Sequence, residues 1–214
     1  DKHLLDQAEG LSFYHRSHAL YHPGVRTFLE KFGYYDIFLV DIETGDIVYS
    51  VFKELDYGTS LLDGPYSDTN FAEAFREAST MNQGEFSLKD YEPYTPSYEA
   101  PASFMATPVF NEGRRVGVLI FQMPLEPINE IMTQRAGMGE TGETYLVGAD
   151  LLMRSDSYLD PESHTVSASF RNPELGKVDT DATNAAFNGE SGHEIVIDYN
   201  GNPVLSSYKL VDLG

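Results

Sequence analysis

Tyrosine and serine side chains gather in one short segment of the chain, residues 90–101. Each tyrosine there presents a flat apolar body with a hydrogen-bonding tip, a combination that suits a small polar or aromatic ligand. Polar residues from other segments can converge on the same site once the chain folds. The alternative for each tyrosine is that it covers the edge of a sheet. The candidate ligand-binding residues are Asp36, Tyr49, Tyr57, Tyr91, Tyr94, Ser97, Tyr98, Ser103 and Gln122.

Three histidines, His15, His18 and His22, recur at i, i+3 and i+7, so a helix would place their imidazoles on one face. That spacing resembles a metal site. Pro23 interrupts the helix beside His22, however, and no carboxylate follows at ligand spacing. We therefore expect no metal and no cofactor, and we interpret the histidines as a polar helix face that a dimer contact could use.

The remaining motifs favour a binding protein over an enzyme. Asp41, Glu43 and Asp46 resemble the start of a calcium loop, but the later bidentate Glu of an EF-hand is missing, which favours a hairpin turn. Residues 154–156, Arg-Ser-Asp, belong either to a second ligand pocket or to a surface ion pair. No serine-hydrolase elbow, zinc-protease or Walker motif is present. A glycosidase or esterase is the enzyme alternative, and a hydrolase screen would test it.

The composition is that of a folded, acidic domain. Hydrophobic residues make up 41% of the 214 residues, which is enough for a packed core. Asp plus Glu number 34 against 14 Lys plus Arg, and the resulting net charge of -20 would repel nucleic acid and an anionic membrane surface. The absence of cysteine excludes disulfides but leaves the compartment open.

No segment of the sequence is long enough to cross a membrane. The longest apolar run, residues 116–121, is far short of the ~20 residues that a membrane helix needs. Residue 1 is not Met. We therefore expect a soluble fragment of a longer protein.

Apolar periodicity and turn residues predict the elements that position the candidate side chains. In the first half they predict a helix, a hairpin, a second helix and a second hairpin. Pro23-Gly24 is expected to break the first helix. The segments are helices at 1–31 and 70–79, hairpin strands at 35–41 with 46–51 and 103–110 with 115–123, and a connecting helix at 125–134.

The element order of the first half then recurs, with a hairpin at 143–155, a helix at 181–188 and strands at 194–198 and 203–210. No parallel strand-helix-strand unit is visible. The sequence therefore predicts an α+β fold with a long N-terminal helix and two tandem modules, each an antiparallel sheet with flanking helices. The expected divisions are an N-terminal helical region at 1–32, a first module at 33–132 and a second module at 133–214 that lacks its last strand.

Three stretches of the chain carry a family resemblance. They are YDIFLVDIETGDIVYSVFKELDYGTSL (35–61), YTPSYEAPASFMATPVF with GVLIFQMP (94–110 and 117–124) and MGETGETYLVGADLLMRSDS (138–157). Together they resemble the sensor region of bacterial chemoreceptors and sensor histidine kinases with a double Cache architecture, that is, two tandem extracytoplasmic PAS-like modules. The similarity covers nearly the whole chain and follows the family's order.

The resemblance implies a periplasmic, ligand-sensing part of an inner-membrane receptor in chemotaxis or two-component signalling. It implies that module 33–132 is membrane-distal and binds a small molecule, that module 133–214 is membrane-proximal, and that the membrane is reached only through flanking helices. The N-terminal helix is the expected homodimer contact. The alternative is a protein-interaction module that recognises a binding protein or a surface and has no small-molecule ligand.

One departure from the family concerns the ligand. The amino-acid-binding branch is similar to a pattern with Tyr, Arg and Trp-Tyr before the first strands. This chain has no Trp, and SFYHRSHALYH (12–22) does not supply the pattern. Amino-acid sensing is therefore not supported by the sequence.

Overall fold

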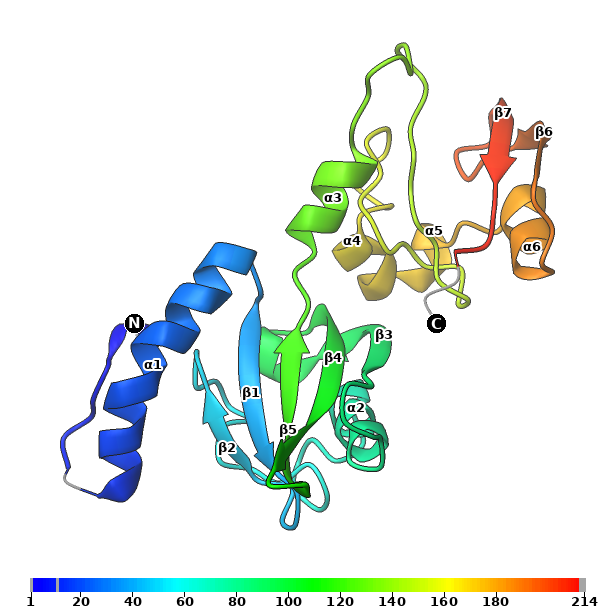
Figure 1. The fold of residues 1–214 in the computed structure, drawn as a ribbon. Helices are drawn as coiled ribbons and strands as arrows, with labels where there is room; N and C mark the ends of the chain where they lie inside the picture. Colours follow the sequence, from blue (N-terminus) through cyan, green and yellow to red (C-terminus); the bar gives the residue numbers. More distant parts are fainter. Residues whose placement is uncertain (1, 11, 212–214) are drawn as a thin grey trace. The chain divides into compact units, whose positions relative to one another are not determined.

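The computed structural model describes residues 2–10 and 12–211, and the chain divides into two compact units (Figure 1). Unit 1 is Asp1–Pro124 and unit 2 is Leu125–Gly214. Both units combine antiparallel strands with short helices, so the α+β fold expected from the sequence is confirmed.

Unit 1 is built on a five-stranded antiparallel sheet with the strand order β2-β1-β5-β4-β3. Alternate residues of each strand face opposite sides of such a sheet, and both sides are covered here. The elements of unit 1 are η1 (Lys2–Leu4), α1 (Phe13–Phe32), β1 (Asp36–Asp41), β2 (Ile47–Ser50), α2 (Asn70–Ala78), β3 (Ser87–Tyr94), η2 (Thr95–Ser97), β4 (Ala100–Asn111) and β5 (Arg114–Gln122).

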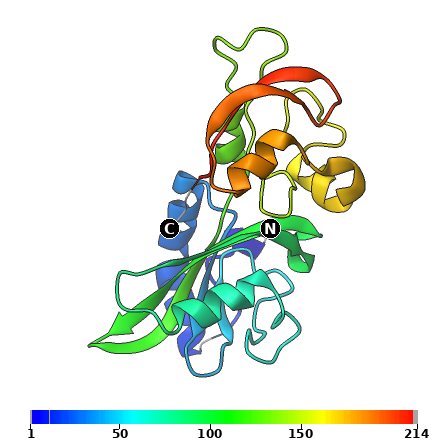
Figure 2. The ribbon, with the colours of Figure 1, turned by 90° about the vertical axis from the view of Figure 1, so that its right-hand side faces the viewer.

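The main core of unit 1 lies between the sheet and α2, which crosses the sheet in Figure 2. Thr69 caps this helix by accepting a hydrogen bond from the backbone N–H of Ala72. The buried ring of Phe71 then packs between two rings of the sheet, with centroid distances of 4.7 Å to Phe38 and 4.5 Å to Phe104. Stacked rings of this kind dominate the burial on this side of the sheet.

The opposite side of the sheet is covered by α1, where Leu29 packs on Ile37 and Val51. This helix runs without interruption through Pro23, so the break expected at Pro23-Gly24 is wrong. A proline inside a helix removes one hydrogen bond at a cost of about 3 kcal/mol. Contacts on both sides of the proline, with His18 and His22 buried before it and Leu29 after it, hold the helix together.

The histidines of α1 do not form the polar face that their spacing suggested. His18 and His22 are buried and stacked, with ring centroids 4.3 Å apart, whereas His15 lies against Ser12. His22 bonds through Nδ1 to the hydroxyl of Tyr49 and through Nε2 to the carbonyl of His3, and burial lowers its pKa. The first bond fixes α1 to β2 and the second fixes it to η1.

The segment that the sequence presented as a Tyr- and Pro-rich connection is an edge strand, β3. Pro93 lies within it, opposite Pro101 of β4. A proline cannot donate to a strand ladder, but an edge strand has one side without a partner strand and therefore tolerates it. The proline concealed the strand from sequence reasoning.

Unit 2 contains a two-stranded antiparallel sheet, β6 and β7, packed on α6. Helix α6 and both strands were expected. The expected hairpin at 143–155 is reduced to a single bridge between Val147 and Met153, flanked by backbone bonds from Arg154 to Leu146 and from Gly148 to Leu152, and the Ser155 hydroxyl accepts the N–H of Leu146. Helices α4 and α5 were not expected. The elements are α3 (Glu126–Met132), α4 (Val166–Arg171), α5 (Pro173–Gly176), α6 (Asp181–Phe187), β6 (Gly192–Ile197) and β7 (Pro203–Tyr208).

Within residues 2–10 and 12–211, none of the helices has both the length and the apolar character that crossing a bilayer requires.

Replacing Phe71 by Ala is expected to destabilise unit 1 by about 3–5 kcal/mol, because it empties a fully buried ring position between Phe38 and Phe104. Urea unfolding followed by circular dichroism would measure the change. Phe13, which is 82% exposed on α1, provides the matched control, and Phe13→Ala should cost less than about 0.5 kcal/mol. Equal effects of the two substitutions would contradict the assigned core.

Candidate functional site

Strand register brings polar side chains together at one end of the α2 side of the sheet. Asp36, the first residue of β1, lies opposite Gln122, the last residue of β5, and Gln122 lies opposite Phe104 of β4. Because Phe38 is two residues along β1 from Asp36 and packs under α2, Asp36 faces the same side. The row Asp36, Gln122 and Phe104 therefore borders the main core.

Asp36 is completely buried and held from three directions. Its Oδ1 accepts the backbone N–H groups of Ile37 and Val51, at 2.6 and 2.9 Å, and its Oδ2 accepts the Ser50 hydroxyl at 2.7 Å. Burial nevertheless raises the pKa of this carboxyl to about 7, and the nearby carboxyl of Asp56 adds to the rise. The Asp36 carboxyl therefore gains or loses its charge near neutral pH.

Asp56 supplies a second buried carboxyl, from the irregular segment 51–69 that joins β2 to α2. Its Oδ2 accepts the hydroxyl of Tyr94 at 2.8 Å. The Tyr94 ring contacts Phe71 and Phe104 edge-on, with centroids 5.9 and 5.2 Å away. Burial raises the pKa of both Asp56 and Tyr94. The Tyr94 hydroxyl therefore keeps its proton and donates a hydrogen bond to the Asp56 carboxyl.

Two side-chain amides, those of Gln122 and Asn70, complete this group of buried polar residues. Gln122 Nε2 donates to the Ser97 hydroxyl at 2.9 Å, and Asn70 Nδ2 donates to the carbonyls of Asp90 and Ala102 at 2.8 and 2.7 Å. We call Asp36, Asp56, Asn70, Tyr94, Ser97 and Gln122 the buried polar cluster.

Three oxygens of the buried polar cluster have no hydrogen-bond partner among the described residues. They are Oδ1 of Asp56, Oδ1 of Asn70 and Oε1 of Gln122. Burying a polar atom without a partner costs about 1–3 kcal/mol, so these three oxygens make the buried polar cluster a candidate binding site.

Four of the nine candidate residues belong to this cluster: Asp36, Tyr94, Ser97 and Gln122. Their assignment to a ligand stays a prediction. Sequence reasoning missed Asp56 and Asn70. Asn70 was considered only as the start of a helix, and nothing in the sequence marks Asp56 among 34 acidic residues.

The other five candidate residues have different surroundings. Tyr49 bonds to His22 on the α1 side of the sheet, and the Tyr57 hydroxyl bonds to that of Tyr14 on α1 at 2.6 Å. Tyr91 donates to the carbonyl of Pro124 at 3.4 Å, Ser103 donates to the carbonyl of Lys89 at 2.6 Å, and Tyr98 is 89% exposed. The bonds of Tyr49, Tyr57 and Tyr91 reach segments outside the sheet, whereas that of Ser103 joins β4 to β3 within it.

In unit 2, residues 154–156 are structural. Arg154 is mostly buried, pairs with Asp150 at 3.0 Å and lies over the ring of Phe170, so the surface position expected for this arginine is wrong. Asp156 accepts the Asn129 side chain and the backbone N–H of Val166. These bonds tie α3 and α4 together.

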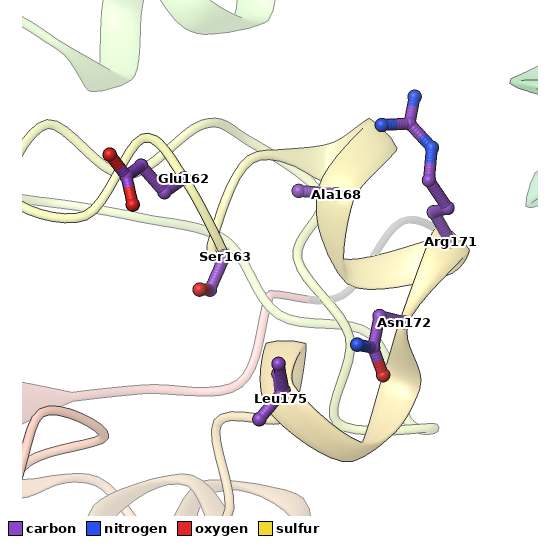
Figure 3. Close-up of a pocket in the computed structure, with 6 residues that line it drawn as sticks. All are labelled: Glu162, Ser163, Ala168, Arg171, Asn172 and Leu175. Atoms are coloured by element: carbon purple, nitrogen blue, oxygen red, sulfur yellow. The ribbon is translucent and has the colours of Figure 1, made fainter.

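Unit 2 also has a small surface pocket beside α4 and α5, shown in Figure 3. Its volume of about 120 Å³ is well below the roughly 300 Å³ at which pockets for metabolite-sized ligands begin. The guanidinium of Arg171 is turned away from Leu175 in Figure 3. The pocket is lined by Glu162, Ser163, Ala168, Arg171, Asn172 and Leu175. We therefore take the buried polar cluster of unit 1 as the candidate site, on the ground of its unpartnered oxygens.

Comparison with known proteins gives matches among solved structures only; neither a protein-family model nor a curated protein sequence matches the chain. The ligand-binding domain of the Pseudomonas aeruginosa PAO1 amino-acid chemoreceptor PctC, solved with GABA, aligns over 94% of this chain and 75% of its own, with a TM-score of 0.53 and 13% identity. The ligand-binding domain of the Campylobacter jejuni chemoreceptor Tlp3, solved with 4-methylisoleucine, aligns over 81% and 60%, with a TM-score of 0.50 and 12% identity.

Other sensor domains align over less of their length. The chain spans 48% of the sensor domain of the V. cholerae histidine kinase DctB and 57% of the ligand-binding domain of the Pseudomonas fluorescens chemoreceptor CtaA. At 12–13% identity the likenesses to PctC and Tlp3 show the fold alone. The chain has the fold of chemoreceptor and histidine-kinase sensor domains, as the sequence resemblance implied.

Replacing Asp36 by Asn is expected to change how stability depends on pH. In the folded protein this carboxyl keeps its proton up to about pH 7, whereas in the unfolded chain it ionises near pH 4. The folded wild type therefore binds more protons in this window and loses stability as the pH rises from about 4 to 7, by at most about 1.4 kcal/mol per pH unit.

The Asp36→Asn variant lacks that loss, so its free energy of unfolding should rise relative to wild type between pH 4 and 7 and stay level above. Urea unfolding at one-unit pH steps would show this. Asp63→Asn removes an exposed carboxylate of the same unit and serves as the control. Parallel profiles for wild type and Asp36→Asn would show that the buried carboxyl ionises normally.

Proposed function

We propose that this chain is the sensing domain of a bacterial transmembrane receptor and that a small molecule binds at the buried polar cluster of unit 1. The observation that carries the proposal is the set of three buried oxygens without partners, one from the segment above the sheet, one from α2 and one from β5. The sensor fold supports it, because this fold serves receptors among the structural neighbours. On this proposal the domain lies outside the cytoplasm and reaches the membrane through flanking helices.

The segment 51–69 brings Asp56 to the buried polar cluster. It contains no helix or named strand, and a bridge between Asp46 and Ser60 and the bond from the Ile47 N–H to the Thr59 carbonyl hold it to the start of β2. Asp56 reaches Tyr94 from this segment, and the Tyr66 ring lies 6.0 Å from that of Tyr94. A ligand that bonds to Asp56 would therefore fix the segment in one position.

The same stretch of chain contacts α1 at two points. Tyr49, one residue before the Asp36 partner Ser50, bonds to His22, and Tyr57, one residue after Asp56, bonds to Tyr14. A ligand that favours one position of this stretch would shift α1 with it, which is a population shift driven by differential affinity. Signalling in this proposal is binding without chemistry, and the chain is not an enzyme.

Self-association through α1 is part of the proposal. The helix exposes a stripe of large apolar side chains that its own unit does not cover, and an exposed apolar stripe marks an interaction site. The stripe contains Phe13, Leu20, Tyr21, Phe28 and Phe32.

Replacing Tyr94 by Phe should abolish ligand binding at the cluster. The substitution removes the hydroxyl that donates to Asp56 Oδ2, so this oxygen also loses its partner and the carboxylate is no longer held in position. A thermal-shift screen with amino acids, amines, organic acids and nucleobases would identify a compound that raises the melting temperature of the wild type. That rise should vanish in Tyr94→Phe and persist in the exposed control Tyr98→Phe.

Two results would contradict this assignment. A rise that survives in Tyr94→Phe would place the ligand elsewhere. No response to any compound would favour the protein-interaction module over a small-molecule sensor.

Replacing Leu20 by Glu is expected to weaken self-association at least about tenfold, because it places a charge in the apolar stripe of α1. Sedimentation equilibrium in detergent, with the flanking membrane helices attached, would measure it. Leu175→Glu is the control, since it makes the same change at an exposed leucine of the other unit. Unchanged association of Leu20→Glu would exclude α1 as the contact.

A further inference from the structure

We propose that residues 2–10, which we call the N-terminal strap, are held along α1 by a latch of two neutral histidines, and that protons release the strap in an acidic medium. The latch consists of His18 and His22 of α1 and the two strap carbonyls that they bind. This inference goes beyond the proposed function, because it assigns a response to pH that needs no ligand.

A row of side chains on α1 holds the N-terminal strap. His18 bonds through Nδ1 to the carbonyl of Asp6 at 2.8 Å, and His22 bonds through Nε2 to the carbonyl of His3 at 2.7 Å. Arg26 donates to the same His3 carbonyl at 3.0 Å and to the Asp6 carboxylate at 2.9 Å. Residues four apart share one face of a helix, so the three side chains form one row beside the strap. Two of the bonds that hold the strap therefore come from imidazoles.

The partners of the two imidazoles fix where their protons lie. A backbone carbonyl only accepts hydrogen bonds, so neutral His18 carries its proton on Nδ1 and neutral His22 carries its proton on Nε2. The lone pair of His22 is then on Nδ1, to which the Tyr49 hydroxyl donates at 2.7 Å. Burial raises the pKa of Tyr49, so this hydroxyl keeps its proton. All three bonds are satisfied while both rings are neutral.

A second proton on either ring has no place in the latch. Nε2 of His18 is buried and has no hydrogen-bond partner among the described residues, so a proton added there would have no acceptor. A proton added to Nδ1 of His22 would meet the proton of the Tyr49 hydroxyl. The two rings are stacked with centroids 4.3 Å apart, so two imidazolium ions would also repel each other. Protonation therefore favours the released strap.

The charges around the two rings add to this effect. Burial lowers the pKa of His22; the bond to the His3 carbonyl opposes this, and Lys53 and other neighbouring cations lower the pKa further. The Asp6 carboxylate is already paired with Arg26. The titratable and charged groups around the latch are Lys2, His3 and Asp6 on the strap, Tyr14, His15 and Arg26 on α1, Tyr49 on β2, Lys53 and Tyr57 on segment 51–69, and Asp36 on β1.

Release of the strap should begin as the pH falls below about 6.5. A histidine in contact with water takes up a proton near that pH, whereas His22 in the latch takes it up at a lower pH. The released state therefore binds more protons than the docked state in this window. The equilibrium shifts toward release by up to about tenfold per pH unit for each proton, and above the window the strap stays docked.

The latch acts on α1, the helix that bears the exposed apolar stripe. His22 bonds at once to the strap, through the His3 carbonyl, and to β2, through Tyr49. Its protonation would therefore alter both contacts of the helix. On this inference the domain responds to acidity through the same helix that the proposed ligand would shift.

A pair of spin labels would measure the position of the strap directly. The chain has no cysteine, so Gln7→Cys on the strap and Glu30→Cys on α1, both at exposed positions, would carry the only two labels. Double electron–electron resonance on the full chain at pH 7.5 and pH 5.0 would give the distance between the labels. Circular dichroism at both pH values would verify that the chain stays folded.

The expected result for the wild type is one narrow distance at pH 7.5 and a broad distribution at pH 5.0, with the released fraction at least about tenfold larger. The double variant His18→Asn, His22→Gln keeps an amide N–H near each bonding nitrogen but takes up no proton, so its strap should stay docked at both pH values. His193→Gln changes an exposed histidine of β6 and is the matched control, which should behave like the wild type.

Three results would overturn the latch. The first is a wild-type strap that stays docked at pH 5.0. The second is release of the double variant at pH 5.0 but not at pH 7.5, which would assign the response to other groups. The third is release that occurs only together with a loss of circular dichroism, which would mean that acid unfolds the chain.

A double variant that is already released at pH 7.5 would call for one further measurement on the wild type. Nitrogen NMR shifts of the imidazoles give the pH at which His18 and His22 take up protons. Protonation of either ring at the pH of release supports the latch, and protonation of both at other pH values contradicts it.

Discussion

The antiparallel pairing of β1 with β5 is the constraint on which the rest of unit 1 depends. It places Asp36 opposite Gln122 and, through the next pairing, Gln122 opposite Phe104. Because side chains alternate along a strand, a shift of β1 by one residue would turn Asp36 to the α1 side. The apolar residues that follow on the same strands, Phe38 and Ile120, must lie under α2, and their burial fixes the register.

This register leaves a carboxyl in the core, and unit 1 stabilises it only in part. Two backbone N–H groups and the Ser50 hydroxyl bind Asp36, yet its pKa still rises to about 7. In Asp56 and Asn70 likewise, one side-chain atom forms hydrogen bonds and the oxygen Oδ1 has no partner among the described residues. A fold selected for stability alone would replace such groups with apolar ones, so their presence fits a site that is completed by a ligand.

On the proposed function, contacts around the cluster would connect a bound ligand to α1. The stretch from Tyr49 to Tyr57 contains groups that face the cluster, Ser50 and Asp56, and groups that bond to α1, Tyr49 and Tyr57. Neighbouring residues of one stretch thus contact both sides of the sheet. Movement of that stretch is a short physical connection between the proposed ligand and the helix that bears the exposed apolar stripe.

The sequence by itself determined the α+β class, the order of elements in unit 1, and a set of polar residues from which Asp36, Tyr94, Ser97 and Gln122 came together. Hydrophobic periodicity and turn residues act over a few neighbours, so local elements are legible in the sequence. Sequence reasoning failed where distant contacts override a local signal, as at Pro23, which tertiary packing keeps inside α1, and in β3, which pairs with β4 despite containing a proline. Only the tertiary structure brought Asp56 and Asn70 to the buried polar cluster, because burial and partnership between residues 20 to 40 positions apart are decided when the sheet closes and not by any short pattern.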